Sequence, residues 1–221
     1  MKRALDLFFS TLGLIILSPL LVWIAWRIHR EDGGSVFYRG ERVGENGEIF
    51  HIFKFRTMVV NAEKLGGSST SDDDPRITRI GKKLRKYKLD ELPQLINVFL
   101  GKMSLVGPRP EVEYYTDMYS EEEKVILTVR PGITDWASLW NPDEGAILAG
   151  AADPDQVYQE LIRPIKLKLQ MQYAQNHSSF TDLKIIFLTL FAICRPQSRF
   201  VQEIKKHLGK IREPELLRHT G

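Results

Sequence analysis

"KLDELPQLINVFLGKMSLVGPRPE", residues 88–111, places two adjacent carboxylates, Asp90 and Glu91, between a basic run and a proline. Pro93 predicts either the first turn of a new helix that begins near Asp90 or a kink in one longer helix. At a helix N-terminus the helix dipole stabilises ionised carboxylates, so capping is the simplest structural interpretation. Capping, however, needs only one of the two acids.

The cations around the two acids favour a chemical role. The basic run "GKKLRKYK", residues 81–88, ends just before Asp90, and the "GPRP" turn follows. An ionised carboxylate near several cations can act as a nucleophile or a metal ligand, and the cations can hold phosphate oxygens. Neighbouring residues on a helix lie about 100° apart, so Asp90 and Glu91 cannot face one bond together. We therefore expect them to have two distinct roles.

Residues 4–26, "ALDLFFSTLGLIILSPLLVWIAW", form an apolar segment that is long enough to cross a membrane. A signal peptide is disfavoured because the segment lacks a small-x-small cleavage site. Pro19 removes a backbone hydrogen bond, and the hydroxyl of Ser18 is placed to compensate for it. Basic residues flank both ends, whereas a spanning helix usually has them on one side. A re-entrant hairpin with both ends cytoplasmic and a kinked span both remain open.

Residues 35–58 predict a β-hairpin whose turn lies at Asn46-Gly47. Alternation along its second strand would bring Lys54 and Arg56 to one face, as a functional pair or as two solvated charges. Residues 61–75 are polar and predict a mobile loop. The acidic run at 72–74 resembles a DxD metal site, but the chain lacks the alternating strands and helices of a nucleotide-binding sheet.

The composition is that of a globular protein. The chain has 221 residues, of which 43% are hydrophobic and 27% charged, and this excludes general disorder. A net charge of +3 permits nucleic acid, phosphorylated metabolites or acidic lipids as partners. Cys194 is the single cysteine, and none of the five histidines has zinc-site spacing.

Residues 180–196 predict a helix with an apolar stripe, which would lie in the core or at a membrane interface. The stripe consists of Phe180, Leu183, Ile186, Phe187 and Leu190. The predicted fold class is α+β: a re-entrant membrane hairpin (1–30), a mainly helical catalytic domain with a small β-hairpin (31–200), and a basic C-terminal tail (201–221).

Several motifs occur in a fixed order along the chain. "KFRTM" (54–58), "DPRITRIGKKLRKYKLDELPQLINVFLGKMSLVGPRPE" (74–111) and "VRPGIT" (129–134) follow the apolar Ser-Pro segment. Together they resemble the bacterial sugar transferase family, the monotopic phosphoglycosyl transferases, over residues 2–195. Such a run of long motifs is far more specific than one short motif.

The resemblance implies a membrane enzyme that transfers a sugar-1-phosphate from a UDP-sugar to polyprenol phosphate, with release of UMP. It implies that Asp90 is the covalent nucleophile and a Mg²⁺ ligand, and that Glu91 helps to deprotonate or orient the acceptor phosphate. The substrate-binding cations would be Lys54, Arg56, Arg85, Arg109 and Arg130. The enzyme would lie on the cytoplasmic face of the bacterial inner membrane, which favours the hairpin. Membrane lipids are expected partners, nucleic acid is not, and homo-oligomerisation stays open.

One segment departs from the family pattern. Many members continue from "PGIT" as G-x-A-Q-x-x-G-R-N, but residues 135–145 of this chain read "DWASLWNPDEG". Part of the nucleotide or sugar contact is therefore not predicted, and the role of residues 135–164 stays open. Two alternatives remain, a membrane-anchored module without catalysis and a DxD glycosyltransferase that moves the sugar alone.

Overall fold

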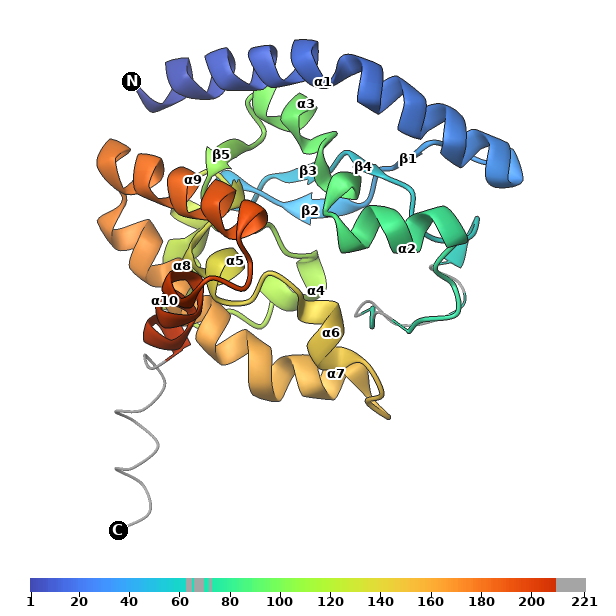
Figure 1. The fold of residues 1–221 in the computed structure, drawn as a ribbon. Helices are drawn as coiled ribbons and strands as arrows, with labels where there is room; N and C mark the ends of the chain where they lie inside the picture. The colour runs from blue at the N-terminus through green and yellow to red at the C-terminus, as the bar shows by residue number, and fades with distance from the viewer. Residues whose placement is uncertain (63–64, 66–69, 72, 210–221) are drawn as a thin grey trace.

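The computed structural model describes residues 1–62, 65, 70–71 and 73–209. Helices dominate, and three small two-stranded sheets lie among them (Figure 1). The helices are α1 (Lys2–Asp32), α2 (Arg79–Lys86), α3 (Gln94–Phe99), α4 (Glu113–Thr116), α5 (Trp136–Trp140), α6 (Glu144–Leu148), α7 (Pro154–Val157), α8 (Arg163–Asn176), α9 (Ser179–Cys194) and α10 (Arg199–Gly209). The strands are β1 (Phe37–Tyr38), β2 (Glu41–Val43), β3 (Ile49–His51), β4 (Lys54–Phe55), β5 (Ser104–Val106) and β6 (Gly132–Thr134).

Helix α1 runs without interruption through the predicted break. The Ser18 hydroxyl donates a 2.8 Å hydrogen bond to the carbonyl of Ile15, which is the carbonyl that Pro19 cannot serve because it lacks an N–H. Figure 1 shows α1 as one bent helix over the rest of the molecule. The compensation by Ser18 is confirmed. Of the hairpin and the kinked helix that the sequence left open, α1 has the form of one bent helix (Figure 1).

Both ends of α1 are tied to the same globular body. At the N-terminal end, Lys2 pairs with Asp182 of α9 at 2.7 Å, and Asp6 accepts a hydrogen bond from the Ser104 hydroxyl at 3.0 Å. At the C-terminal end, Asp32 pairs with Arg56 at 2.6 Å. The two basic ends of the apolar helix therefore lie on one body.

The middle of α1 packs on α3, the helix that follows the two adjacent acids. A Cβ on Gly13 would lie 3.1 Å from Leu95, so the glycine lets the two helices approach closely. Further along α1, Ile24 and Ile28 are buried against Phe55 and Leu84. Helix α1 is thus the apolar element against which β4, α2 and α3 are positioned.

The predicted hairpin is present. Strands β2 and β3 pair antiparallel, and the turn between them uses positive φ angles at Asn46 (58°) and Gly47 (79°), as an Asn-Gly turn requires. Strands β1 and β4 extend the same hairpin as a second antiparallel pair. Residues 63–64, 66–69 and 72 of the loop predicted at 61–75 lie outside the described residues.

Strands β5 and β6 form a parallel pair that the sequence did not reveal. The pair brings Gly107 of the "GPRP" turn against Gly132 of "PGIT". A Cβ on Gly132 would lie 2.0 Å from the backbone nitrogen of Gly107, so this contact requires glycine. The two motifs are therefore parts of one structural unit.

The largest cluster of buried apolar side chains joins β5, α5, α8, α9 and α10. Helix α10 contributes Leu208, which is 8% exposed, and Val201 is 4% exposed. The segment predicted as a basic tail therefore continues the fold up to Gly209, and residues 210–221 lie outside the described part of the chain.

Helix α9 exposes most of its apolar stripe. Phe180, Leu183, Phe187 and Leu190 are 51–78% exposed, while Ile185 is fully buried. This exposure favours the interfacial interpretation over a core helix. Within the described residues, α1 is the one helix that is long and apolar enough to cross a membrane.

Candidate functional site

The two acids begin a new helical segment. Lys88 has a left-handed conformation (φ 55°). The chain therefore changes direction after α2, and a 3₁₀ turn starts at Leu89. Pro93 has helical angles and immediately precedes α3. The first of the two interpretations is therefore confirmed: Asp90 and Glu91 occupy the first turn of a new helical segment.

Glu91 is held by two cations from distant parts of the chain. The Lys54 ammonium, from β4, donates a 3.0 Å hydrogen bond to its Oε1. The Arg109 guanidinium, from the turn after β5, donates to Oε2 at 3.0 Å and also to Oε1. Such a bidentate pair fixes the orientation of both side chains. The structure thus brings together three residues predicted for the site.

The charges of this cluster determine its protonation. Burial would raise the pKa of Glu91, but the positive charges of Arg109 and Lys54 outweigh burial and hold that pKa well below its usual range. Burial and the charge of Arg109 lower the pKa of Lys54, although Glu91 opposes them. The charge of Glu91 raises the pKa of Arg109. Glu91 is therefore an ionised anchor at neutral pH.

Asp90 has a different environment from its neighbour. Its side chain is buried, and its Oδ1 has no hydrogen-bond partner. Burial, followed by the charge of Glu91, raises the pKa of Asp90. A buried polar atom without a partner costs free energy, so it marks a place where a ligand can bind. The two acids are inequivalent, as their helical spacing predicts.

Two further buried groups near Asp90 lack partners. Nη1 of Arg85 is buried without a hydrogen bond, and the Arg85 charge acts on Asp90. Nε2 of Gln94 is also without a partner, and this side chain is 1% exposed. Gln94 lies four residues after Asp90, on the same side of the helical segment. Sequence reasoning missed Gln94, whose i, i+4 spacing from Asp90 was the available signal.

Asp135 positions the turn that carries Arg109. It is fully buried and caps α5 by accepting from the Ser138 backbone nitrogen at 2.7 Å. Its second oxygen accepts from the Arg109 backbone nitrogen at 3.3 Å and from Gln170 at 3.1 Å. Sequence reasoning missed this role, although Asp135 with Ser138 is the spacing of a helix N-cap.

Two predicted substrate-binding arginines lie elsewhere. Arg56 donates to Asp32 and to the carbonyls of Ser35 and Met58, so its guanidinium secures the end of α1. Arg130 pairs with Glu45 of the hairpin turn at 3.3 Å. The structure does not bring either side chain to Glu91, and their contact with substrate stays a prediction without support from these bonds.

The segment that departs from the family pattern contributes Glu144 to a buried ionic cluster with Lys166 and Glu111. Lys166 of α8 is 4% exposed, and it pairs with Glu111 at 2.6 Å and with Glu144 of α6 at 3.0 Å. In the same segment, Oδ1 of Asp143 lies 3.7 Å from the ammonium of Lys88, which precedes the two acids in the chain. Asp143 therefore lies beside Lys88, two residues before Asp90.

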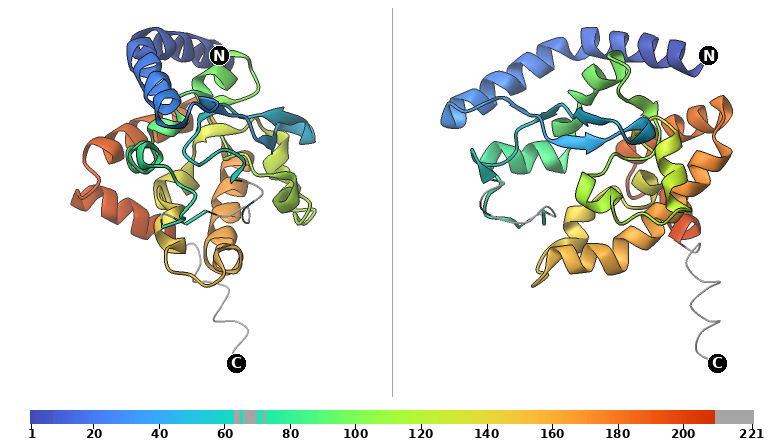
Figure 2. Two further views of the ribbon diagram at one scale, coloured as in Figure 1. Left: turned by 90° about the vertical axis from the view of Figure 1, so that its right-hand side faces the viewer. Right: turned by 180° about the vertical axis from the view of Figure 1, so that it is seen from behind.

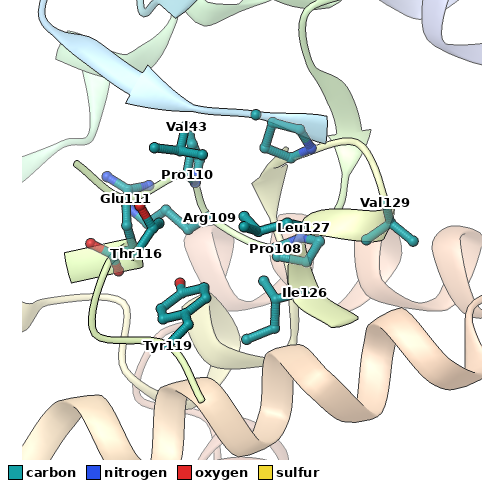
Figure 3. Close-up of a pocket in the computed structure, with 12 residues that line it drawn as sticks. Val43, Pro108, Arg109, Pro110, Glu111, Thr116, Tyr119, Ile126, Leu127 and Val129 are labelled. Carbon is teal, nitrogen blue, oxygen red and sulfur yellow. The ribbon is translucent and has the colours of Figure 1, made fainter. Parts of the chain in front are cut away.

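A small pocket lies on the other side of the "GPRP" turn. Figure 3 shows Arg109, Pro108 and Pro110 between Val43 and Tyr119. Its remaining lining is largely apolar and includes Ile126. Arg109 lines this pocket, and its guanidinium also contacts Glu91.

Asp90 offers one oxygen that could serve as a metal ligand. Among the described residues, no group of three or more His, Cys, Asp or Glu side chains could hold a metal ion. Mg²⁺ commonly binds one or two carboxylates and takes its other ligands from phosphates and water. The unpartnered Oδ1 of Asp90 is a hard oxygen ligand of this kind. In the DxD run, Asp74 pairs with Arg76 at 2.6 Å, and Asp72 lies outside the described residues.

Comparisons with known proteins agree on one family. A family model described as bacterial sugar transferase matches residues 1–196. The exopolysaccharide production protein ExoY of Sinorhizobium fredii is 36% identical over 208 residues, which cover 87% of this chain and 85% of that protein. A UDP-glucose:undecaprenyl-phosphate glucose-1-phosphate transferase of Escherichia coli is 35% identical over 196 residues, which cover 86% of this chain and 39% of that protein.

A third relative has a different sugar in its name. The UDP-N-acetylgalactosamine-undecaprenyl-phosphate N-acetylgalactosaminephosphotransferase of Aeromonas hydrophila is 36% identical over 195 residues, which cover 87% of this chain and 43% of that protein. The chain therefore spans most of the Sinorhizobium protein and less than half of the other two.

Proposed function

Because this chain belongs to the bacterial sugar transferase family, we propose that it transfers a sugar-1-phosphate from a UDP-sugar to undecaprenyl phosphate and releases UMP. The product, a lipid-linked sugar diphosphate, would begin the assembly of a surface polysaccharide. The names of the relatives support an enzyme of this type. These names contain different sugars, so the sugar itself is left open.

The observation that carries the proposal is the inequivalence of the two acids. Glu91 is saturated by Lys54 and Arg109, whereas the adjacent Asp90 keeps a buried oxygen without a partner. A nucleophile needs a free lone pair beside the reacting atom. Asp90 meets this condition, and Glu91 in this state does not.

In the first half-reaction, the carboxylate of Asp90 attacks the phosphorus that bears the sugar. A new O–P bond forms as the bond from that phosphorus to UMP breaks, and UMP leaves with the electron pair. The cations Lys54, Arg85 and Arg109 stabilise the charge on the phosphate oxygens. When bound, Mg²⁺ would screen the diphosphate, and Asp90 would be its protein ligand.

In the second half-reaction, an oxygen of undecaprenyl phosphate attacks the same phosphorus. The bond to Asp90 breaks, which restores its carboxylate and yields the lipid-linked product. Glu91 orients the acceptor phosphate through the two cations that it holds, Lys54 and Arg109. A covalent intermediate lets a soluble donor and a lipid acceptor use one site in turn.

The structure of α1 supports a monotopic arrangement on the cytoplasmic face of the inner membrane. Its two ends bind the same body through Lys2 and Asp32, and a spanning helix would have one end on the far side of the bilayer. Its apolar side chains, among them Phe8, Ile15 and Trp23, are 52–66% exposed. The helix would therefore rest within one leaflet and place the site beside the lipid acceptor.

The released nucleotide tests the proposal. The purified chain, Mg²⁺ and undecaprenyl phosphate are incubated with a panel of UDP-sugars, and the nucleotide products are separated by chromatography. Phosphosugar transfer gives UMP and requires Asp90. Release of UDP would mean that the protein transfers the sugar alone. If neither UMP nor UDP were released with any donor, the protein would be a module without catalytic activity.

A further inference from the structure

Helix α2 carries a row of four exposed cations. Arg79, Lys82, Lys83 and Lys86 follow the spacing i, i+3, i+4 and i+7, which places them on one face of the helix. All four are exposed. Within the described part of the chain, none of them forms an ion pair. We call these four residues the basic stripe.

The other faces of α2 are already occupied. Ile80 and Leu84 pack against the C-terminal half of α1, and Gly81 lies against the backbone of Thr57, where a Cβ would come within 2.0 Å. Arg85 belongs to the surroundings of Asp90. The basic stripe therefore serves neither the packing of α2 nor the contacts described around the two acids.

Like charges three or four residues apart destabilise a helix. The stripe contains several such pairs, for example Arg79 with Lys83 and Lys82 with Lys86. An arrangement that is unfavourable in isolation is relieved by a partner of opposite charge. The row extends over about 10 Å of helix, which is long for a single phosphate group and suits an extended anionic surface.

The neighbouring part of α1 has the features of a membrane–water interface. Trp23 and Trp26 are about half exposed, and the guanidinium groups of Arg27 and Arg30 stack over their rings. Tryptophans and arginines are typical of the level at which lipid headgroups lie. Because Leu84 of α2 packs on Ile24 and Ile28, helix α2 lies next to this level.

The arrangement of the helices agrees with such a surface. In the left view of Figure 2, α2 and α9 lie on the same side of the molecule, below α1. Both α1 and α9 expose large apolar side chains, such as Val22 and Phe187. Helix α2, which carries the basic stripe, therefore lies near two helices that expose apolar side chains (Figure 2).

We propose that the basic stripe binds the headgroups of anionic phospholipids in the membrane on which α1 rests. The partner is the lipid surface itself, because α2, which carries the stripe, packs on α1 and the stripe takes no part in the contacts described around Asp90. Anionic lipid would orient the protein so that α2, and with it Arg85, stays at headgroup depth. This inference rests on the proposed membrane location and is independent of the chemistry assigned to Asp90.

Transfer of the full-length protein from detergent to lipid vesicles tests the proposal. Partition is measured by flotation with vesicles of phosphatidylcholine alone and of phosphatidylcholine mixed with phosphatidylglycerol. The test variant is Lys82→Gln/Lys86→Gln. The matched control, Arg42→Gln/Lys124→Gln, removes the same net charge from β2 and from the 3₁₀ helix Glu123–Thr128. Circular dichroism verifies that each variant is folded.

The wild type and the control should prefer the anionic vesicles, and salt should weaken this preference. The stripe variant should lose partition into anionic vesicles by on the order of tenfold or more, with unchanged partition into neutral vesicles. Equal partition of the stripe variant and the control into anionic vesicles would overturn the proposal. So would a wild type without preference for phosphatidylglycerol.

A second readout separates lipid binding from substrate binding. UDP-sugar is added in detergent without lipid, and the rate of UMP release is compared between the stripe variant and the wild type. Equal rates support a stripe that serves the membrane. A stripe variant that loses UMP release in detergent would instead assign the stripe to the donor and overturn the proposal. Absence of UMP release in both proteins would contradict the proposed function. The flotation result would still show whether the basic stripe binds anionic lipid.

Discussion

Arg109 holds both carboxylate oxygens of Glu91 through its two terminal nitrogens. Lys54 adds a third hydrogen bond, so the acid next to Asp90 is saturated before substrate arrives. The charges of Lys54 and Arg109 also act on Asp90. We infer that the cations are pre-positioned by Glu91, which lowers the cost of arranging them during the reaction.

Removal of Arg109 should therefore slow the reaction strongly. Arg109→Ala should lower kcat/KM for the best UDP-sugar by a factor that corresponds to about 3 kcal/mol, because it removes a donor to developing charge. Arg109→Lys keeps the charge but loses the bidentate contact, so it should fall between wild type and alanine. Unchanged kcat/KM in Arg109→Ala would remove this residue from the phosphate site.

The two acids should have opposite effects on stability. The raised pKa of Asp90 means that its ionised form destabilises the fold as pH rises, so Asp90→Asn should not lower the Tm at neutral pH and should tend to raise it. The pKa of Glu91 is lowered, so its negative charge stabilises the fold at any pH above the usual pKa of a glutamic acid. This stability is lost as the pH falls through the lowered pKa. Glu91→Gln should cost on the order of 3 kcal/mol, because Lys54 and Arg109 lose their partner.

Thermal unfolding of both variants at neutral and acidic pH measures these effects. The difference between wild type and Glu91→Gln should shrink as pH falls. If Asp90→Asn destabilised the protein more than Glu91→Gln did at neutral pH, the assignment of Glu91 as the structural anchor would be wrong.

The first half-reaction should depend on the ionisation of Asp90. Burial and Glu91 raise the pKa of this carboxyl, and a protonated carboxyl is a poor nucleophile. UMP release in a single turnover without acceptor should therefore increase with pH as the carboxyl of Asp90 ionises. Rapid-quench measurements across acidic pH give this profile. A rate that does not change with pH would contradict a nucleophile in this environment.

Both ends of α1 should lie on the cytoplasmic side. With the exposed Cys194 replaced by serine, single cysteines at positions 2 and 30 are treated with a membrane-impermeant maleimide. In intact cells neither should react, because both ends of the helix join the same body. In inverted vesicles both should become accessible. Labelling of either position from outside intact cells would establish a span.

Local patterns in the sequence were sufficient for several parts of the structure. The Asn46-Gly47 turn, the hydroxyl of Ser18 and the helix start near Asp90 each depend on neighbouring residues, and the structure confirms them. The sequence left a hairpin and a kinked helix open at Pro19, and α1 is one bent helix (Figure 1). A single compensated carbonyl at Ile15 lets the helix continue past the proline.

Other parts depend on contacts between distant segments. Strands β5 and β6 are only three residues long each, which is too short to give a periodic signal, yet their pairing places the "GPRP" turn. Asp135 and Lys166 act through residues far away in the sequence. Alternation would place Lys54 and Arg56 on one face, but β4 ends at Phe55, so Arg56 turns toward Asp32.

The central claim is that Asp90 forms the covalent intermediate, and intact-protein mass spectrometry tests it most directly. The purified chain receives Mg²⁺ and a UDP-sugar without undecaprenyl phosphate, and peptide mapping locates any added mass. We predict an adduct of one sugar phosphate on Asp90 that disappears when the acceptor is added. Asp90→Asn should show no adduct and no turnover, while Glu91→Gln should still be labelled. An adduct on another residue, or full turnover in Asp90→Asn, would contradict the account.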